Sequence, residues 1–333
     1  MNVSIIGTGR IGFSLERDTL RYKPCTHAGA IQALINIKIN KKNPLQWNFI
    51  CDLDKNKLDE IEKYIKKNNK NIHLQKTVDY NDVLKAKPDL LIISTDTSTH
   101  YKIVKAAMKS GVQKIVLEKP VALNRKHAMD IWNMAVETGT HIWINYERRH
   151  HFKYMNIKKI IETQMPYGAP VYYRGWFATG NSSFYKTGSQ NEGALLHDTT
   201  HLVDLAQYLF GEIKKYDGAI YAKKSLHKIS TLHKNGVPGE IWTTISSKFF
   251  HFEMEIMFER GRILVGNGFF QEEKAEKSKY YKNFTSLSRP QYFADEKIKL
   301  INNPFFRLYE SVINDRYDTS FLKDACQNIQ YLT

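Results

Sequence analysis

The chain of 333 residues contains few cysteines and no pattern that would join them. Cys25, Cys51 and Cys326 form an odd and widely spaced set without a Cys-x-x-Cys pair. A disulfide framework needs paired cysteines, and a zinc knuckle needs closely spaced ones. The sequence therefore argues against both, and we expect three ordinary thiols.

Long apolar runs are also absent from the sequence. No run approaches the ~20 residues that span a bilayer, and no basic segment followed by a long apolar stretch opens the chain. We expect no membrane span, no membrane partner and no signal peptide, which favours a cytoplasmic protein. Internal repeats and low-complexity linkers are missing as well, and the length predicts two domains.

Acidic residues are scarce relative to basic ones, with 34 Asp and Glu against 49 Lys and Arg, so the formal net charge is +15. A basic surface is typical of phosphate binding. However, the lysines gather in asparagine-rich runs such as residues 38–43 and 66–71, without the interleaved aromatic residues of a base-stacking surface. We expect solvated loops and no nucleic-acid partner, although a positive field could help attract a phosphorylated or nucleotide-linked substrate.

What the sequence does contain is a glycine-rich opening. A short apolar strand, with Val3, Ile5 and Ile6, is predicted to run directly into a GxGxxG turn. Glycines at these positions permit a tight turn, a close approach of a pyrophosphate and close packing of the next helix, whose N–H groups face an anion. Although glycines also cluster in ordinary turns, this placement favours a dinucleotide-binding site. The residues of the turn are Gly7, Thr8, Gly9, Arg10, Ile11 and Gly12.

An acidic residue is expected at the tip of the second strand of such a fold. Here the strand 47–51 ends at Asp52, whose carboxylate would accept hydrogen bonds from the ribose hydroxyls and repel a 2′-phosphate. We therefore expect NAD rather than NADP. The gap from the glycines is about twice the usual ~20 residues, which we attribute to an insertion at residues 21–26. Alternatively, Asp52 caps the helix that begins near Lys55.

Strands and helices alternate over the first 148 residues. This alternation predicts an α/β Rossmann domain with a doubly wound parallel sheet at residues 1–148. Further strands are expected at 90–94, 114–117 and 141–145. Helices are expected at 12–20, 27–37, 55–67, 81–85 and 124–137, and a further amphipathic helix after residue 100 is expected to end at residue 110.

The pattern changes after Arg148. Residues 149–333 predict an α+β domain with an open, mostly antiparallel sheet, one face of which we expect another subunit to cover. A broken helix is expected at 305–331. The other predicted helices are 156–163 and 194–210, and the predicted strands are 171–177, 216–222, 241–250, 252–258 and 262–265, with a hairpin turn at 259–261.

Two polar loops follow apolar strands of the first domain, at residues 95–100 and 118–120. The carboxyl ends of parallel strands are where open α/β sheets bind ligands. A nicotinamide enzyme needs a group that exchanges the hydroxyl proton while a hydride moves. Lys119 is one candidate, because a partly desolvated lysine gives up its proton more readily. The alternative is a surface lysine in a basic protein.

A second candidate lies in the predicted helix of the second domain. His197 and His201 are four residues apart and share a helix face, and Asp198 and Asp204 lie three residues to either side of His201, where they could orient its ring. Two histidines at this spacing could ligate zinc, but the sequence identifies no third ligand and we expect no metal. The alternative is that the histidines have a structural role, with their hydrogen bonds satisfied in a domain interface. This alternative applies more to His197 than to His201.

The chain resembles the glucose-fructose oxidoreductase / inositol dehydrogenase / rhizopine-catabolism (Gfo/Idh/MocA) family over essentially its whole length. The resemblance lies in the order and spacing of four segments, which are the GxGxxG turn, residues 95–100, Glu118-Lys119-Pro120 and residues 193–204. Glu-Lys-Pro after the fifth strand is the most specific mark. The resemblance implies a Rossmann domain, an α+β domain whose open sheet forms a homodimer or homotetramer, and NAD(P)-dependent chemistry on sugars, inositols or their derivatives.

The resemblance also implies roles for individual residues. Lys119 would bind the substrate and the nicotinamide ribose and assist proton transfer, and His201 would be the principal acid/base, with His197 as a further catalytic candidate. The family usually has Asp and Gly where this chain has His197 and Thr199, and often has proline where it has Asp96. The other implied contacts are Thr95, Thr97, His100 and Glu118 to the cofactor, and Tyr146, Arg149 and Asp198 to the substrate.

These features together predict an NAD-dependent oxidoreductase. It would interconvert a secondary alcohol and a ketone on a sugar, an inositol or a nucleotide-linked sugar derivative, in carbohydrate or surface-glycan metabolism. The unusual His197 leaves an alternative open, namely a catalytically inactive NAD-binding regulator or structural partner with the same fold.

Overall fold

The computed structural model describes residues 1–40, 42–68, 72–180, 195–221, 226–294 and 298–332. The chain divides into two compact units. The first comprises Met1–His150 and Ile298–Gln330, and the second comprises His151–Lys297 and Tyr331–Thr333.

The first unit is built on a parallel sheet with the strand order β3-β2-β1-β4-β5-β6. The order reverses between β1 and β4, and helices cover both faces, so the predicted doubly wound Rossmann fold is confirmed. β3 was not predicted, because its three residues are polar and mostly exposed. The strands are β1 (Asn2–Ile6), β2 (Gln46–Cys51), β3 (Gln75–Thr77), β4 (Leu90–Ile93), β5 (Lys114–Leu117) and β6 (His141–Ile144).

Polar side chains begin most of the helices around this sheet. Thr26, Asp79, Asp96 and Asn124 each accept a hydrogen bond from a backbone N–H of the first turn of the helix that follows. The unusual Asp96 therefore has a structural reason, because it caps the helix after β4. These helices are α1 (His27–Asn36), α2 (Lys55–Asn68), α3 (Tyr80–Lys85), α4 (Thr97–Lys109) and α5 (Arg125–Thr138).

The helix predicted for residues 12–20 is wrong. The Phe13 N–H donates to the carbonyl oxygen of Gly9 at 2.9 Å, which closes one helical turn, and the chain then forms only a short 3₁₀ helix, Ser14–Arg17. After a loop it returns, and the N–H groups of His27 and Ala28 donate to the carbonyl oxygens of Ile11 and Gly12 at 3.1 and 3.0 Å. The helix after the glycine turn thus consists of two pieces of chain, and the insertion spans residues 14–25 rather than 21–26.

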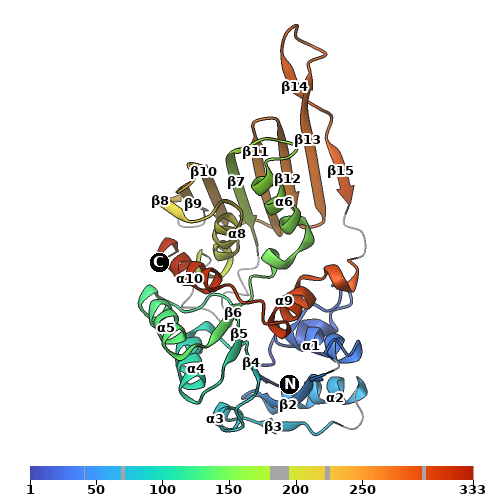
Figure 1. Ribbon diagram of the computed structural model, residues 1–333, viewed down its shortest axis with the longest axis vertical. Coiled ribbons are helices and arrows are strands. Elements are labelled where there is room, and N and C mark those ends of the chain that lie inside the picture. The colour runs from blue at the N-terminus through green and yellow to red at the C-terminus, as the bar shows by residue number, and fades with distance from the viewer. Residues whose placement is uncertain (41, 69–71, 181–194, 222–225, 295–297, 333) are drawn as a thin grey trace. The chain divides into compact units, whose positions relative to one another are not determined.

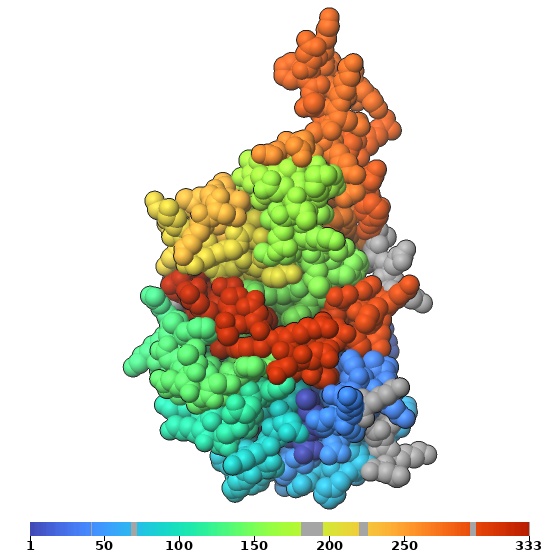
Figure 2. Space-filling view, in the orientation of Figure 1, coloured from blue at the N-terminus to red at the C-terminus, as the bar shows by residue number. Residues whose placement is uncertain are grey.

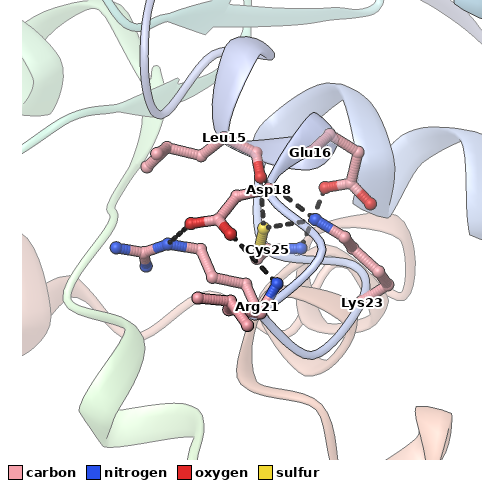
Figure 3. Close-up of polar contacts among 7 residues, drawn as sticks. Leu15, Glu16, Asp18, Arg21, Lys23 and Cys25 are labelled. Atoms are coloured by element: carbon pink, nitrogen blue, oxygen red, sulfur yellow. Dashed lines mark hydrogen bonds and ion pairs between the residues drawn. The ribbon is translucent and has the colours of Figure 1, made fainter.

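Polar contacts close the looped-out segment, residues 14–25, just before α1, and Figure 3 shows those among Leu15, Glu16, Lys23 and Cys25. The Glu16 carboxylate accepts hydrogen bonds from the Cys25 N–H at 3.0 Å and from the Thr26 hydroxyl at 2.8 Å. The Lys23 ammonium donates to the carbonyl oxygen of Leu15 at 3.0 Å. All three cysteines are buried and free.

Two helices near the C-terminus, α9 (Pro304–Ile313) and α10 (Thr319–Asn328), form the expected broken helix but belong to the first unit. This differs from the expected assignment of all of residues 149–333 to the second domain. α9 packs beside α1 (Figure 1), and its apolar residues enter the core around β1. An amphipathic pattern predicts a helix but does not reveal which sheet it covers. The buried residues of α9 include Phe305, Phe306, Leu308, Tyr309, Val312 and Ile313.

The second unit contains an open sheet, to which the described residues contribute nine strands in the order β14-β13-β12-β11-β7-β10-β9-β8, with β15 paired to β13. Its pairs are antiparallel except β7 with β10, so the expected mostly antiparallel sheet is confirmed. The helices α6 (Phe152–Thr163) and α8 (Thr200–Phe210) pack against each other, and α8 lies on β7. The strands are β7 (Pro170–Ala178), β8 (Ile213–Tyr221), β9 (Leu226–His233), β10 (Pro238–Thr244), β11 (His251–Phe258), β12 (Gly261–Gly266), β13 (Phe269–Lys277), β14 (Thr285–Leu287) and β15 (Gln291–Ala294).

A hairpin extends from the edge of this sheet. β13 continues past its pairing with β12 and turns back through β14, and the hairpin stands away from the rest of the second unit in both views (Figures 1 and 2). We call residues 277–293 the arm. It holds four Lys or Arg residues and no acid, and its aromatic residues Tyr280, Tyr281, Phe284, Tyr292 and Phe293 are exposed, the first at 84%.

Among the helices of the described part of the chain, none combines the length and apolar character needed to cross a membrane.

Candidate cofactor and catalytic site

The three glycines of the opening turn each meet a different structural requirement. Gly7 has a φ of +91°, and a Cβ there would lie 2.5 Å from the carbonyl oxygen of Ser94. A Cβ on Gly12 would overlap the carbonyl oxygen of Gly7. A Cβ on Gly9, in contrast, would meet nothing within 4 Å. Packing therefore requires Gly7 and Gly12, whereas Gly9 leaves open space above the turn, as close approach of a phosphate demands.

Asp52 lies directly after β2 and bonds to this turn. One carboxylate oxygen accepts hydrogen bonds from the N–H of Thr8 at 2.7 Å and from its hydroxyl at 2.9 Å, and the other accepts from the Asp54 N–H at 3.0 Å. A carboxylate has about four acceptor positions, so capacity remains for a further donor. The alternative of a helix cap is wrong, because Asp54 accepts from the Asn56 N–H at 2.9 Å where α2 begins.

The loop after β4 contacts the glycine turn. A Cβ on Gly7 would lie 2.8 Å from the Thr95 backbone nitrogen, so the two segments touch at the carboxyl ends of neighbouring strands. The Thr95 hydroxyl bonds to that of Thr99 at 2.7 Å. Thr97 is buried at the first position of α4. This contact lies where the strand order reverses, which is the usual ligand position of such a sheet.

Glu118 follows β5 and has a buried carboxylate. Its Oε1 accepts hydrogen bonds from His27 at 2.8 Å and from Asn145 at 2.5 Å, and its Oε2 lies 3.3 Å from the backbone nitrogen of Lys119, which donates to it. Burial alone would favour the neutral acid, but the bond and charge of His27 and the bond from Asn145 hold the pKa of Glu118 below its ordinary value. The carboxylate is therefore directed at protein groups, and its contact with the cofactor stays a prediction.

His27, Asn145 and Tyr309 are site neighbours that the sequence analysis missed. The Tyr309 hydroxyl bonds to the other ring nitrogen of His27 at 2.6 Å. Asn145 could have been found, because it is a polar residue at the carboxyl end of a predicted parallel strand. His27 and Tyr309 carry no such mark, since their positions depend on the looped-out segment and on α9.

His100 is buried beneath the two loops. Its Nδ1 lies 2.9 Å from the carbonyl oxygen of Pro120, and its Nε2 lies 3.2 Å from that of Thr95. Burial lowers its pKa, although both carbonyl contacts act in the opposite direction. The imidazole thus joins the loop after β4 to the loop after β5, and its expected contact along the cofactor stays a prediction.

Lys119 is partly buried, two residues beyond the end of β5. The two expected substrate contacts that follow β6 lie against α10. Tyr146 is 1% exposed and its ring centroid is 6.4 Å from that of Phe321. The Arg149 guanidinium lies 4.3 Å from the same ring centroid and 3.5 Å from the Asp324 carboxylate. α10 therefore holds both residues in the first unit.

The second unit contains the histidine pair. His197 and Asp198 lie in a π-helical turn, Leu195–Thr199, which leads into α8 and its residue His201. The Nδ1 of His197 is 2.7 Å from the Asp198 carboxylate. Asp204 is buried in α8. Residues 193 and 194 of the segment 193–204 lie outside the described residues.

The structure thus connects the expected cofactor residues within the first unit, from Asp52 through the glycine turn and Thr95 to His100 and the Glu118–Pro120 loop, and it pairs His197 with Asp198 in the second. Among the residues that the structure describes, no group of three or more His, Cys, Asp or Glu side chains is placed to hold a metal ion.

Comparison with known proteins agrees with this arrangement. Residues 1–146 match the model of an oxidoreductase family with an NAD-binding Rossmann fold, Gfo/Idh/MocA. The scyllo-inositol 2-dehydrogenase (NAD(+)) of Bacillus subtilis (strain 168) is 25% identical over 190 residues, 54% of this chain and 55% of the relative. The match therefore spans about half the length of that protein.

Solved structures of low identity share the fold of nearly the whole chain. A levoglucosan dehydrogenase in complex with NADH and levoglucosan has a TM-score of 0.76 at 16% identity, covering 100% of this chain and 96% of the other. The UDP-N-acetylglucosamine 3-dehydrogenase from Acidithiobacillus ferrooxidans has a TM-score of 0.73 at 18% identity, covering 99% and 95%. Residues 1–146 of this chain are therefore similar to the NAD-binding Rossmann domain of the Gfo/Idh/MocA oxidoreductases, and the solved structures share the fold of nearly the whole chain.

Proposed function

We propose that this protein is an NAD-dependent oxidoreductase that interconverts a secondary alcohol and a ketone on a sugar, an inositol or a nucleotide-linked sugar derivative. The observation that carries the proposal is the ligand edge of the first sheet, where the open glycine turn, Asp52 and Lys119 follow β1, β2 and β5. The relatives named above are dehydrogenases of an inositol, of levoglucosan and of UDP-N-acetylglucosamine, which supports this substrate class.

In this proposal the first unit binds the cofactor. The pyrophosphate approaches the turn at Gly9, where a side chain would otherwise stand, and the remaining acceptor capacity of Asp52 receives the ribose hydroxyls. A negative charge at Asp52 disfavours a 2′-phosphate, so NAD is bound in preference to NADP. When bound, NAD supplies the acceptor for the hydride of the alcohol carbon. Thr95 and Thr97 complete the contacts at the next strand end.

The proton of the substrate hydroxyl is moved by side chains of this chain. We assign the principal acid/base role to His201 and an assisting role to Lys119. The Asp198 carboxylate, 2.7 Å from Nδ1 of His197, orients the imidazole, and His197 can then exchange a proton with, or orient, a substrate hydroxyl. The pair His197–Asp198 can thus take the role that a carboxylate usually has at this position in the family. Arg149 and Tyr146 are proposed to border the substrate.

The open sheet supports the proposal of a homodimer or homotetramer. The exposed aromatic residues of the arm, together with Phe249 and Phe250 at 62% and 59% exposure, provide apolar surface on the second unit. A two-stranded hairpin is at best marginally stable by itself, so packing against a second copy would stabilise the arm.

Turnover of the full-length protein tests the proposed reaction. NADH binding is measured first by fluorescence titration, and turnover is then screened with NAD and with NADH on free, phosphorylated and nucleotide-linked sugars and inositols and their ketones. Lys119→Ala and His201→Ala are each expected to lose at least about a hundredfold in turnover. Lys126→Ala and His251→Ala, which alter other lysine and histidine side chains, serve as controls.

Two outcomes contradict the proposal. Full turnover in both Lys119→Ala and His201→Ala would remove the assigned roles. NADH binding without turnover on any substrate of the panel would instead favour a regulator or structural partner that keeps the fold without the chemistry.

A further inference from the structure

The segment Glu118-Lys119-Pro120 is attached to the protein interior on both sides of its lysine. On one side the Glu118 carboxylate bonds to His27, and on the other the Pro120 carbonyl oxygen bonds to His100. Both imidazoles are fully buried, and they come from different helices, α1 and α4. Lys119 itself is partly exposed between these two attachment points.

The attachment through His27 is part of a longer chain of hydrogen bonds. Burial, and then the negative charge of Glu118, raises the pKa of Tyr309 well above its ordinary value, so its hydroxyl keeps its proton. The hydroxyl bonds to Nδ1 of His27 at 2.6 Å, and the Nε2–H of His27 donates to Oε1 of Glu118. The His27 ring also packs in T-shaped contacts with Phe305 and Tyr309, with interplanar angles of 78° and 88°. α9 thus fixes the ring orientation.

The last contact of this chain reaches the backbone of the lysine. The second oxygen of Glu118 accepts a hydrogen bond from the Lys119 N–H at 3.3 Å. The other oxygen of the carboxylate is held by His27 and Asn145. Rotation of the Glu118 side chain would leave buried polar groups unpaired, which is unfavourable. The carboxylate is therefore a fixed acceptor for the Lys119 backbone.

We propose that His27, with Tyr309, and His100 are positioning residues that fix Lys119 at the ligand edge of the first sheet. The inference rests on the proposed role of Lys119 and adds residues that act on it without contacting substrate or cofactor. His27 acts through Glu118 on the N–H side of the lysine, and His100 acts through Pro120 on its carbonyl side.

The second unit provides matched controls for both attachments. The Tyr173 hydroxyl lies 3.1 Å from Nε2 of His233, and Nδ1 of His233 lies 2.6 Å from the carbonyl oxygen of Gly211. Tyr173 and His233 are fully buried, like Tyr309 and His100. Tyr173→Phe and His233→Leu therefore remove the same chemical groups as Tyr309→Phe and His100→Leu, but from the second unit.

The test measures the reactivity of the Lys119 amine in the full-length protein. Each variant is treated with acetic anhydride over a range of pH, and acetylation of Lys119 is compared with that of the other lysines by mass spectrometry. We expect Tyr309→Phe and His100→Leu to change the Lys119 rate by about fivefold, as a free-energy change of about 1 kcal/mol in its placement would. His100→Asn, whose amide can still donate to the Pro120 carbonyl oxygen, should restore the wild-type rate.

Urea unfolding of the same variants separates positioning from stability. Tyr309→Phe and Tyr173→Phe should lose similar stability, but only Tyr309→Phe should change Lys119. Lys119 rates within about twofold of wild type in both Tyr309→Phe and His100→Leu, or an equal change in Tyr173→Phe, would overturn the inference. NADH binding and turnover of the wild type are measured in parallel. A failure of the proposed function shows in these two measurements, whereas a failure of the positioning inference shows in the acetylation of Lys119.

Discussion

Because Glu16 contacts the start of α1, we predict that Gly29→Ala changes the free energy of unfolding with opposite signs in the presence and in the absence of the Glu16 carboxylate. Gly29 lies in the first turn of α1, and a Cβ there would overlap the Glu16 carboxyl group. Alanine normally stabilises a helix by about 0.5–1 kcal/mol relative to glycine. In this chain, however, Gly29→Ala displaces the carboxylate, which then loses its bonds to Cys25 and Thr26.

The magnitude follows from those two bonds. Hydrogen bonds to a charged group contribute about 1.5–3 kcal/mol each, and solvent screening of the partly exposed Glu16 reduces the loss of the two bonds together to about 2 kcal/mol. After the helix gain is subtracted, Gly29→Ala should destabilise the protein by about 1 kcal/mol. In the Glu16→Ala background the carboxylate is already gone, so the same substitution should stabilise by about 0.5–1 kcal/mol.

Urea unfolding of the wild type, both single variants and the double variant measures this coupling, and hydrogen exchange of the α1 amides shows whether it is local to that helix. Glu60→Ala is the control, because Glu60 forms an exposed ion pair with Arg17 of the same looped-out segment at 2.8 Å and should contribute less than about 1 kcal/mol. An effect of Gly29→Ala with the same sign and size in both backgrounds would refute the reasoning.

Three further predictions concern acid stability, cofactor choice and assembly. Burial, with the charges of Arg149 and Arg307, lowers the pKa of His150 to about 4, and burial lowers that of His233 to about 4, from an ordinary value of 6.5. As the pH falls, these histidines therefore take up protons in the unfolded state before they do so in the folded state. The free energy of unfolding should fall between pH 6.5 and 4 by up to about 3 kcal/mol for each histidine. His233→Gln should flatten the pH profile of urea unfolding, and an unchanged profile contradicts the assignment. NADH should bind at least about tenfold more tightly than NADPH in fluorescence titrations, and equal affinities would argue against Asp52 on the ribose. Tyr280→Ser with Tyr281→Ser should lower the mass measured by light scattering, whereas an unchanged oligomer excludes the arm from the interface.

The sequence predicted the parts of the fold in which apolar residues dominate. The runs at β4, β5 and β6 are nearly wholly apolar and buried, and the glycine turn follows an equally buried β1. Strands with polar inward positions were missed. In β9 the alternating buried residues are His227, Ile229, Thr231 and His233, so the burial alternates while the hydrophobicity does not.

The candidate site was predictable where one strand end determines the position of a residue. Asp52 follows β2 directly and Lys119 lies two residues beyond β5, so both lie at the expected edge of the sheet. The environment of Glu118 could not be predicted, because its partners His27 and Asn145, and the Tyr309 that bonds to His27, come from three distant parts of the chain. A single sequence contains no local signal for such a contact.

The looped-out segment explains why an insertion next to the cofactor turn is compatible with an intact site. The bonds of His27 and Ala28 to Ile11 and Gly12 replace the helical bonds that a continuous chain would make, so the turn and α1 keep the relation they have in an uninterrupted helix. The turn can therefore face a phosphate while His27, the first residue of α1, reaches Glu118 beneath the sheet edge. Leu20 of the insertion is 96% exposed, so the added residues extend outward. The length of residues 14–25 should accordingly be variable without loss of NADH binding, provided that Glu16, Cys25 and Thr26 still close the loop.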